Sequence, residues 1–313
     1  MKHVSFTLSL FICLLIFNSC KQDSVSTTSS FKTENVIIIL IDGPRYSETW
    51  GDSTHQYIPG QEAISKEGVV LTDFNNDGTT NTVNGHTAIT TGYYENLNNT
   101  GMDTPTHPGL FQLFLEHKKS AITDAWIISS KDKLQVLGDC NDSVYKGRYN
   151  PQTDCGNNGL FTGYREDSTT FNDAVNILTT FHPHFAFISF KQPDMSGHLN
   201  DWNGYLTGLK QSDDYAYLIW QLLQSDPHYK DKTALFITND HGRHLDSVAN
   251  GFVSHGDNCS GCRHIMLLAA GPDFKKNATI DKHYGLTDIN ATISYLFGLK
   301  NTGQGVVIEE LFK

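Results

Sequence analysis

The sequence predicts an α/β fold with a mostly parallel central sheet and helices on both faces. Short apolar runs rich in β-branched and aromatic residues alternate with segments of helical periodicity. The first run, residues 36–41, has six consecutive apolar residues, which is typical of a strand buried on both faces. A chain of 313 residues with 38% hydrophobic content can bury one large core.

The elements are expected in a strand–helix alternation along the chain. Apolar runs bounded by polar residues or glycine predict strands at residues 36–41, 69–74, 125–129, 184–190, 233–238 and 264–270. Helical spacing predicts helices at residues 61–66, 86–91, 110–117, 170–181, 212–223 and 286–296. Residues 131–168 have no strong period and are expected to form an insertion or cap. Because crossover connections join parallel strands, this alternation favours a parallel sheet.

The N-terminus has the features of a targeting segment. A short basic start precedes an apolar run at residues 8–17, which is too short to span a membrane comfortably. Asn18-Ser19-Cys20 then resembles a bacterial lipoprotein cleavage box, which implies cleavage before Cys20 and its acylation; an ordinary secretory signal is the alternative. We therefore expect a signal peptide at residues 1–19, a Ser/Thr-rich flexible tether at residues 20–33 and one folded domain at residues 34–313.

The formal net charge of −11 bears on the class of partner. A strongly acidic chain is a poor candidate for binding nucleic acid or an anionic membrane through its surface charge. An anionic substrate remains compatible with it, because bound metal ions reverse the sign of the local field.

Four cysteines follow the tether: Cys140, Cys155, Cys259 and Cys262. An even number in an exported protein predicts disulfides, with three connectivities open. The Cys-Ser-Gly-Cys stretch alone does not predict a zinc site, because no second cysteine pair of that kind is present. A redox motif is a further alternative there.

Asp and His residues come after three of the expected strands, and a further His lies in a loop before the strand expected at residues 264–270. Read singly, each is a turn residue or a surface polar group, and Asp42-Gly43 is such a case. Together they reach the carboxyl ends of strands, where open α/β sheets bind ligands. Carboxylate and imidazole suit zinc, manganese or iron. The candidate ligands are Asp42, Asp194, His198, Asp240, His241 and His255.

The chain contains the stretches VIIILIDG, TVNGHTAITTG, KQPDMSGH, FITNDHG, SHGDN and LLAAGPDFK. They resemble the alkaline phosphatase superfamily, and within it the type I phosphodiesterase/nucleotide pyrophosphatase branch. The resemblance extends from Asn35 to about Leu299. The resemblance implies a catalytic domain with two divalent metals, zinc in the first place and manganese as the alternative. One metal would take Asp194, His198 and His255, and the other Asp42, Asp240 and His241.

The resemblance also implies a nucleophile. When Thr91-Gly92 and His86 are aligned with the family motif, Thr82 falls at the nucleophile position. Thr79 and Thr80 are nearby alternatives. A bound cation would activate such a hydroxyl. Where the diesterase branch usually has Pro-Asn, this chain has Asn84-Gly85. The candidate substrate contacts are Asn84, Asn98, Asn99, Arg45 and Lys191.

The function expected from these residues is an exported two-metal hydrolase of phosphate esters that works through a phospho-threonine intermediate. The sequence around Thr82 has no Lys or Arg, which favours phosphodiesters or phosphonate esters over monoesters. A formylglycine sulfatase is excluded because no Cys/Ser-x-Pro-x-Arg motif is present.

Two alternatives remain, a metal-dependent phosphomutase of the same superfamily and a degenerate binding lipoprotein. Export argues against the phosphomutase, and the full set of ligand types argues against the degenerate protein. The expected partners are a small phosphorylated substrate and a membrane reached through the lipid anchor, and the expected location is the bacterial cell envelope, periplasmic or surface-facing. The sequence gives no indication of the oligomeric state.

Overall fold

The computed structural model describes Met1 and residues 31–313. Residues 2–30 lie outside the described residues. They include most of the expected signal peptide, the expected lipidation site Cys20 and most of the expected tether. Residues 31–313 form one compact unit. Within the described residues, no helix combines the length and apolarity needed to cross a membrane.

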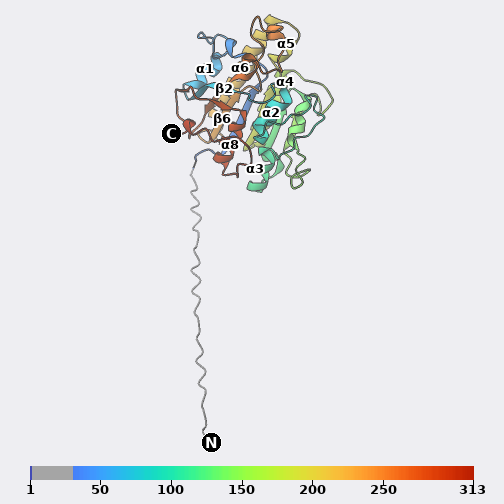
Figure 1. The fold of residues 1–313 in the computed structure, drawn as a ribbon. Helices are drawn as coiled ribbons and strands as arrows, with labels where there is room; N and C mark the ends of the chain where they lie inside the picture. The colour runs from blue at the N-terminus through green and yellow to red at the C-terminus, as the bar shows by residue number, and fades with distance from the viewer. Residues whose placement is uncertain (2–30) are drawn as a thin grey trace. The chain divides into compact units, whose positions relative to one another are not determined.

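A nine-stranded sheet runs through the centre of this unit (Figure 1). Eight strands lie in the order β4–β3–β5–β1–β6–β7–β2–β8, and β9 also pairs with β2. All pairings are parallel except those of β7 with β6 and β2. The strands are β1 (Asn35–Ile41), β2 (Gly68–Asn75), β3 (Ala125–Ser129), β4 (Gln152–Cys155), β5 (Phe185–Phe190), β6 (Thr233–Thr238), β7 (His264–Ala270), β8 (Ala278–Ile280) and β9 (Tyr284–Gly285).

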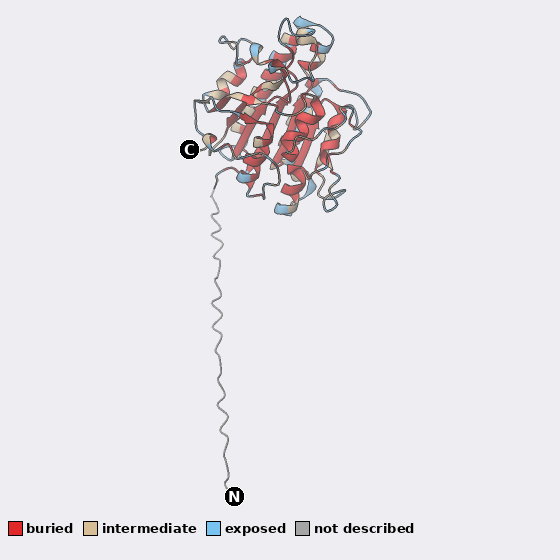
Figure 2. Cartoon of the chain, in the orientation of Figure 1, coloured by how far each residue is buried: buried red, intermediate tan, exposed pale blue. Residues whose placement is uncertain are grey.

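Helices cover both faces of the sheet. Successive side chains of a strand point to opposite faces, so the continuous apolar run of β1 presents apolar side chains on both faces, and each face must be covered. In β1, Val36, Ile38 and Leu40 pack in the core under α2 (Thr82–Thr91), α3 (Leu110–Lys118) and α8 (Leu286–Phe297). Ile37, Ile39 and Ile41 pack in the opposite core, under α1 (Pro59–Ser65), α4 (Asp167–Phe181) and α6 (Trp202–Ser225). Figure 2 shows the central strands buried between these layers. The predicted fold class is therefore confirmed.

The boundaries of several elements differ from the sequence prediction for identifiable reasons. Helix α2 begins at Thr82, four residues earlier than expected, because the Asn81 side chain caps it by accepting a hydrogen bond from the backbone N–H of Asn84. The loop after β5 contains a short helix, α5 (Asp194–His198), that sequence periodicity did not predict. Residues 131–168 add a 3-10 helix, Asp132–Gly138, and the edge strand β4.

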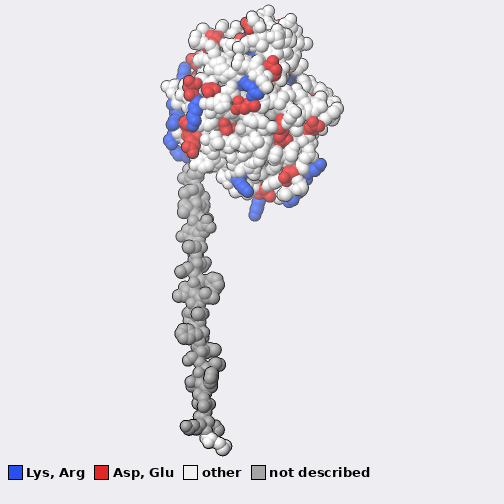
Figure 3. Space-filling view, in the orientation of Figure 1, with Lys and Arg blue, Asp and Glu red and all other residues white. Residues whose placement is uncertain are grey.

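The four cysteines are free thiols in the structure, so the predicted disulfides are not formed there. Cys140, Cys155 and Cys262 are buried, and Cys259 is partly exposed. On the face drawn in Figure 3, acidic and basic side chains are interspersed, and the coloured residues of that face form no continuous basic surface.

Candidate metal centre

The candidate metal centre lies at the carboxyl ends of three adjacent parallel strands. β1 is paired in parallel with β5 on one side and β6 on the other, with Ile41 opposite Phe190 and Leu40 opposite Thr238. The residues that follow these strands therefore meet at one edge of the sheet. The three carboxylates brought together in this way are those of Asp42, Asp194 and Asp240, each at most 2% exposed.

Asp42, Asp240 and His241 form a first group, in which one ligand atom from each lies within 4.8 Å of the others. His241 Nε2 is 3.5 Å from Asp42 Oδ1 and 3.4 Å from Asp240 Oδ2. His241 Nδ1 donates to the Gly242 carbonyl, which leaves the Nε2 lone pair directed at the two carboxylates. This is the tautomer that binds a metal ion.

Asp194 and His255 form a second group, and His241 also lies within 4.8 Å of both. His255 Nε2 is 3.4 Å from Asp194 Oδ1. Its Nδ1 donates to the Thr80 carbonyl, so Nε2 again carries the lone pair. The His241 and His255 rings stack at 3.7 Å between centroids.

His198 lies beside this second group with a different hydrogen-bond pattern. Its Nε2 is 3.3 Å from Asp194 Oδ1 and 3.1 Å from His255 Nε2. Its Nδ1 accepts a hydrogen bond from Arg243, which places the ring proton on Nε2. All six predicted ligands thus gather in one place, and the facing Nε2 atoms of His198 and His255 contact each other.

The donor set fits divalent cations. Asp42 Oδ1, Asp240 Oδ2 and His241 Nε2 are buried and have no hydrogen-bond partner among the described residues. Burial and the neighbouring carboxylate of Asp240 raise the pKa of Asp42 well above its usual value. Burial lowers the pKa of His241 to about 3, so this ring is neutral at pH 7. Buried carboxylates without partners are costly unless a cation compensates them, so these atoms are suited to hold metal ions.

Lys131, which follows β3, is a site residue that the sequence did not reveal. Its Nζ lies 2.7 Å from Asp42 Oδ2 and 2.7 Å from Asp194 Oδ2, and it donates to Thr82 Oγ1 at 3.2 Å. Although burial alone would lower the pKa of this amine, the carboxylates of Asp194 and Asp42 raise it above its usual value. Lys131 lies in the segment expected to be an insertion, where no motif marked it.

Arg243 is the second residue that the sequence did not reveal. Its side chain is fully buried and forms an ion pair with Asp194. It packs where two glycines lack a side chain: an added Cβ at Gly43 would lie 3.1 Å from Arg243 Nη1, and one at Gly197 would lie 2.8 Å from Arg243 Cζ. In the sequence, only its position directly after Asp240-His241-Gly242 could have indicated that Arg243 belongs to the site.

Thr82 is the first residue of α2 and is 1% exposed. Its hydroxyl faces Lys131, and its carbonyl accepts a hydrogen bond from His86 Nδ1 at 2.8 Å. His86 Nδ1 is also 3.4 Å from Asp240 Oδ2, so this helix turn adjoins the first ligand group. The competitor Thr80 uses its hydroxyl to donate to the Asp257 carbonyl. The geometry therefore favours Thr82 over Thr80 as the nucleophile.

Among the candidate substrate contacts, Asn99 lies at the site. Its Oδ1 accepts from the backbone N–H of Val83 at 2.9 Å and from Lys133 Nζ at 3.1 Å, which places it at the start of α2. Asn84 is nearby, but both ends of its amide are engaged: Nδ2 donates to Asn81 Oδ1 and Oδ1 accepts from the Leu97 backbone.

The other three candidate contacts have partners elsewhere. Arg45 is ion-paired with Glu48 and Asp246. Lys191 Nζ pairs with Glu166 at 3.0 Å. Asn98 is exposed, and its Oδ1 accepts from the backbone of Thr100. These three side chains are thus engaged by other residues, and the ammonium that contacts Thr82 is that of Lys131.

Comparisons with known proteins agree with this fold. Residues 162–301 match the family model described as the Metalloenzyme superfamily. A phosphopentomutase from Pseudothermotoga lettingae is 26% identical over 159 residues, which cover 49% of this chain and 37% of that protein. The chain therefore matches little more than a third of the length of this curated relative.

Solved structures share the fold over most of the chain. A protein in the alkaline phosphatase superfamily from Vibrio parahaemolyticus has a TM-score of 0.66 at 16% identity and covers 90% of this chain and 71% of its own. Murine ectonucleotide pyrophosphatase/phosphodiesterase 5 has a TM-score of 0.65 at 14% identity, covering 89% of this chain and 100% of its own. The phosphonate monoester hydrolase of Agrobacterium radiobacter has a TM-score of 0.62 at 14% identity, covering 89% and 77%.

Residues 162–301, which match the Metalloenzyme superfamily model, carry five of the six candidate ligands. The fold of the chain is that of the alkaline phosphatase superfamily, as in the solved structures named above. The resemblance read from the sequence motifs is thereby confirmed.

Proposed function

We propose that this protein hydrolyses phosphate monoesters, with Thr82 as the nucleophile. The observation that carries the proposal is the contact of Lys131 Nζ with Thr82 Oγ1 at 3.2 Å. The sequence favoured diesters because no Lys or Arg lies near Thr82 along the chain. In the folded protein, Lys131 lies beside Thr82 although it is distant along the chain, and this contact supports a substrate with more negative charge.

The charge of the substrate is the reason that this contact matters. A phosphate monoester carries a charge of about −1.5 to −2 at neutral pH, whereas a diester carries about −1. An ammonium beside the nucleophile matches the additional charge. Lys133 adds a second amine at the start of α2, and burial together with the charge of Lys131 lowers its pKa to about 8. At pH 7 both amines are protonated.

The chemistry follows from the groups at this edge of the sheet. Divalent ions held by the six ligands would lower the pKa of a bound hydroxyl and neutralise the phosphoryl oxygens, and zinc suits these ligands first, with manganese as the alternative. Thr82 Oγ would form a bond to phosphorus as the ester oxygen leaves, giving phospho-threonine, which water then hydrolyses. Lys131 would hold a phosphoryl oxygen against the attacking hydroxyl. Asn99, anchored by Val83 and Lys133, is placed to bind another.

The test uses the purified, metal-loaded protein on p-nitrophenyl phosphate, bis(p-nitrophenyl) phosphate and p-nitrophenyl sulfate. We expect kcat/KM for the monoester to exceed that for the diester by at least about tenfold, or about 1.4 kcal/mol. Thr82→Ala should abolish turnover, and the control Thr79→Ala should retain it. A preference for the diester would overturn the monoester proposal, and full activity of Thr82→Ala would overturn the nucleophile.

A phosphomutase is the second candidate, and the sequence similarity to a phosphopentomutase favours it. Both reactions use a phosphorylated nucleophile and differ in the acceptor. The two are distinguished by the product: a hydrolase releases inorganic phosphate from a sugar phosphate, whereas a mutase returns an isomer without net release. Measuring free phosphate and isomer in one reaction decides between them.

We also propose that the protein acts as a lipoprotein in the bacterial cell envelope. The cleavage box ending at Cys20 supports this proposal. Cells that express the chain should incorporate labelled palmitate into it, and Cys20→Ala should abolish the label. Labelling that persists in the variant would contradict acylation at this residue.

A further inference from the structure

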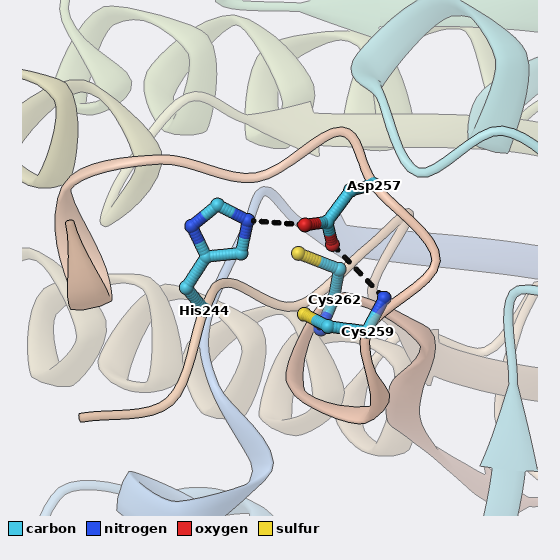
Figure 4. Close-up of side chains that lie close together, drawn as sticks. All are labelled: His244, Asp257, Cys259 and Cys262. Carbon is cyan, nitrogen blue, oxygen red and sulfur yellow. Dashed lines mark hydrogen bonds and ion pairs between the residues drawn. The ribbon is translucent and has the colours of Figure 1, made fainter. Parts of the chain in front are cut away.

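A second cluster of metal-ligating side chains lies in the connection between β6 and β7 (Figure 4). Its members are His244, Asp257, Cys259 and Cys262, and one ligand atom from each lies within 4.8 Å of all the others. None of the four belongs to the centre at the ends of β1, β5 and β6. The sequence indicated only the cysteine pair, because His244 and Asp257 join it through the folding of the loop.

His244 presents an unpartnered nitrogen to the cluster. Its Nδ1 faces Asn250 Oδ1 at 3.2 Å and Ser254 Oγ at 3.4 Å. Because the Ser254 hydroxyl donates to Asn250 Oδ1, Nδ1 is the donor to that oxygen, and the lone pair is on Nε2. Nε2 is buried and makes no hydrogen bond to any of the described residues, although Asp257 Oδ2 is 3.1 Å away. A lone pair and a carboxylate oxygen at this distance repel each other unless a cation lies between them.

The two cysteines approach from the other side of the same space. Cys259 precedes α7 (Ser260–Arg263), and its sulfur accepts from the backbone N–H of Cys262, so a single turn brings both sulfurs to the cluster. Cys262 is fully buried, and both are free thiols. Asp257 is fixed in turn by the backbone N–H of Cys259, which donates to Asp257 Oδ1 at 2.9 Å. Figure 4 shows the His244 ring, the carboxylate and the two sulfurs turned toward a common centre.

We propose that these four side chains form a zinc site of structural type, separate from the candidate catalytic centre. Zinc binds Cys sulfur at about 2.3 Å, and His nitrogen and carboxylate oxygen at about 2.0–2.2 Å, in a tetrahedron. Ligand atoms around such an ion are then roughly 3–4 Å apart, so a set already within 4.8 Å needs only small side-chain movements to close on it. Two thiolates with one imidazole select zinc over magnesium, calcium or manganese. Four protein ligands leave no open position for substrate.

The site ties down the loop that carries His255. The backbone carbonyl of Asp257 accepts from Thr80 Oγ1 at 2.8 Å, and the Thr80 carbonyl accepts from His255 Nδ1. At the other end, the Gly242 backbone N–H donates to the Cys262 carbonyl at 2.8 Å, directly after His241. A zinc ion would therefore fix the positions of both ligand histidines without contacting the substrate.

Cobalt substitution tests the proposal on the full chain, because thiolate ligands give Co²⁺ an intense near-ultraviolet charge-transfer absorption that carboxylate and imidazole ligands do not. The protein is prepared under reducing conditions, stripped of metal and titrated with Co²⁺. We expect the amplitude of this absorption at saturation to correspond to one thiolate-bound Co²⁺ per chain, whether or not the carboxylate centre also binds metal or supports turnover. Zinc should displace the cobalt and remove the absorption.

The double variant Cys259→Ser/Cys262→Ser should lose this absorption and one equivalent of bound zinc, and His244→Gln should weaken zinc binding. Cys140→Ala removes another buried thiol, outside the cluster. This variant should leave the cobalt absorption and the amount of bound zinc unchanged. If the wild-type protein shows no thiolate–cobalt absorption, the proposal is wrong even if a variant fails to fold. A Cys259–Cys262 disulfide that persists under reducing conditions would overturn it in favour of a redox or structural disulfide.

Discussion

Lys131 Nζ donates a hydrogen bond to Thr82 Oγ1 across 49 positions of the chain, and the same amine is 2.7 Å from Asp42 and from Asp194. One ammonium thus connects the candidate nucleophile to a carboxylate from each of the two expected ligand groups. It is the cation that these two carboxylates share. If metal ions were held by the carboxylates, the same ammonium would be available to a phosphoryl group at Thr82.

Replacing Lys131 should change the substrate preference. Lys131→Ala removes a charged donor from a buried site, and we expect kcat/KM for p-nitrophenyl phosphate to fall by about 10²–10³-fold, or about 2.7–4 kcal/mol. The diester has less negative charge on its phosphoryl oxygens, so its kcat/KM should fall less. The ratio of kcat/KM for the monoester to that for the diester should therefore fall. Steady-state kinetics on both substrates measures the ratio. Lys191→Ala is the matched control, because its amine pairs with Glu166, and the ratio should not change.

The same variant should make stability depend more strongly on metal. Without metal, Lys131→Ala leaves Asp42 and Asp194 buried without this ion-pair partner, a loss that costs about 3–5 kcal/mol for a buried pair. With metal bound, the carboxylates have cations and the cost should be much smaller. Thermal unfolding of wild type and variant, each with EDTA and with Zn²⁺, gives four midpoints. If the unfolding midpoints of wild type and variant differ by the same amount with EDTA as with Zn²⁺, the amine and the metal do not share this role.

Gly85 allows α2 to lie close to the segment that carries Asp240. A Cβ at Gly85 would lie 2.5 Å from the Asp240 carbonyl oxygen. In an ordinary helix interior, Gly→Ala stabilises by about 1 kcal/mol. Here the contact is with backbone, and overpacking of this kind costs about 1–3 kcal/mol, so we expect Gly85→Ala to be destabilising on balance and to weaken metal binding. Chemical denaturation and metal titration measure the two effects.

Gly109 provides the control for this substitution. It has φ −83° at the cap of α3, and a Cβ there would have no contact closer than 3.7 Å. Gly109→Ala should therefore cost only the preference for glycine over alanine at an N-cap, roughly 0.5–1 kcal/mol, and leave metal affinity unchanged. Equal effects of the two substitutions would contradict a close approach at Gly85.

The part of the site that the sequence predicted is the part that local pattern encodes. Asp42, Asp194 and Asp240 each follow an apolar run, and the length and composition of such a run indicate the strand that positions them. In a parallel sheet all carboxyl ends lie along one edge, so the sequence predicted that these carboxylates share that edge. The structure brings them into contact because β5, β1 and β6 are neighbours in the sheet.

The residues that the sequence missed depend on tertiary position. Lys131 follows β3, which is separated from β1 by β5 in the sheet, and only the strand order brings its long side chain back to Thr82. Arg243 is positioned by the space above two glycines, and His244 by a loop without periodicity. The antiparallel direction of β7 was equally invisible, since a buried apolar run has the same composition in either direction.

Asp213 in α6 should make stability depend on pH. Its carboxylate accepts the backbone N–H groups of Gly60 and Gln61 at 2.7 and 2.9 Å, but burial outweighs these bonds and raises the pKa of Asp213 to about 6. Between the ordinary pKa of 3.8 and about 6, the folded state binds more protons than the unfolded state, so this group's contribution to stability is present below pH 3.8 and is lost as the pH rises through 6. At about 1.4 kcal/mol per pKa unit, the loss is at most about 3 kcal/mol. Asp213→Asn cannot ionise, so the variant should gain stability relative to wild type between pH 4 and pH 7, as measured by urea denaturation at both values. A difference in unfolding free energy that is the same at both pH values would show that Asp213 ionises normally in the folded protein.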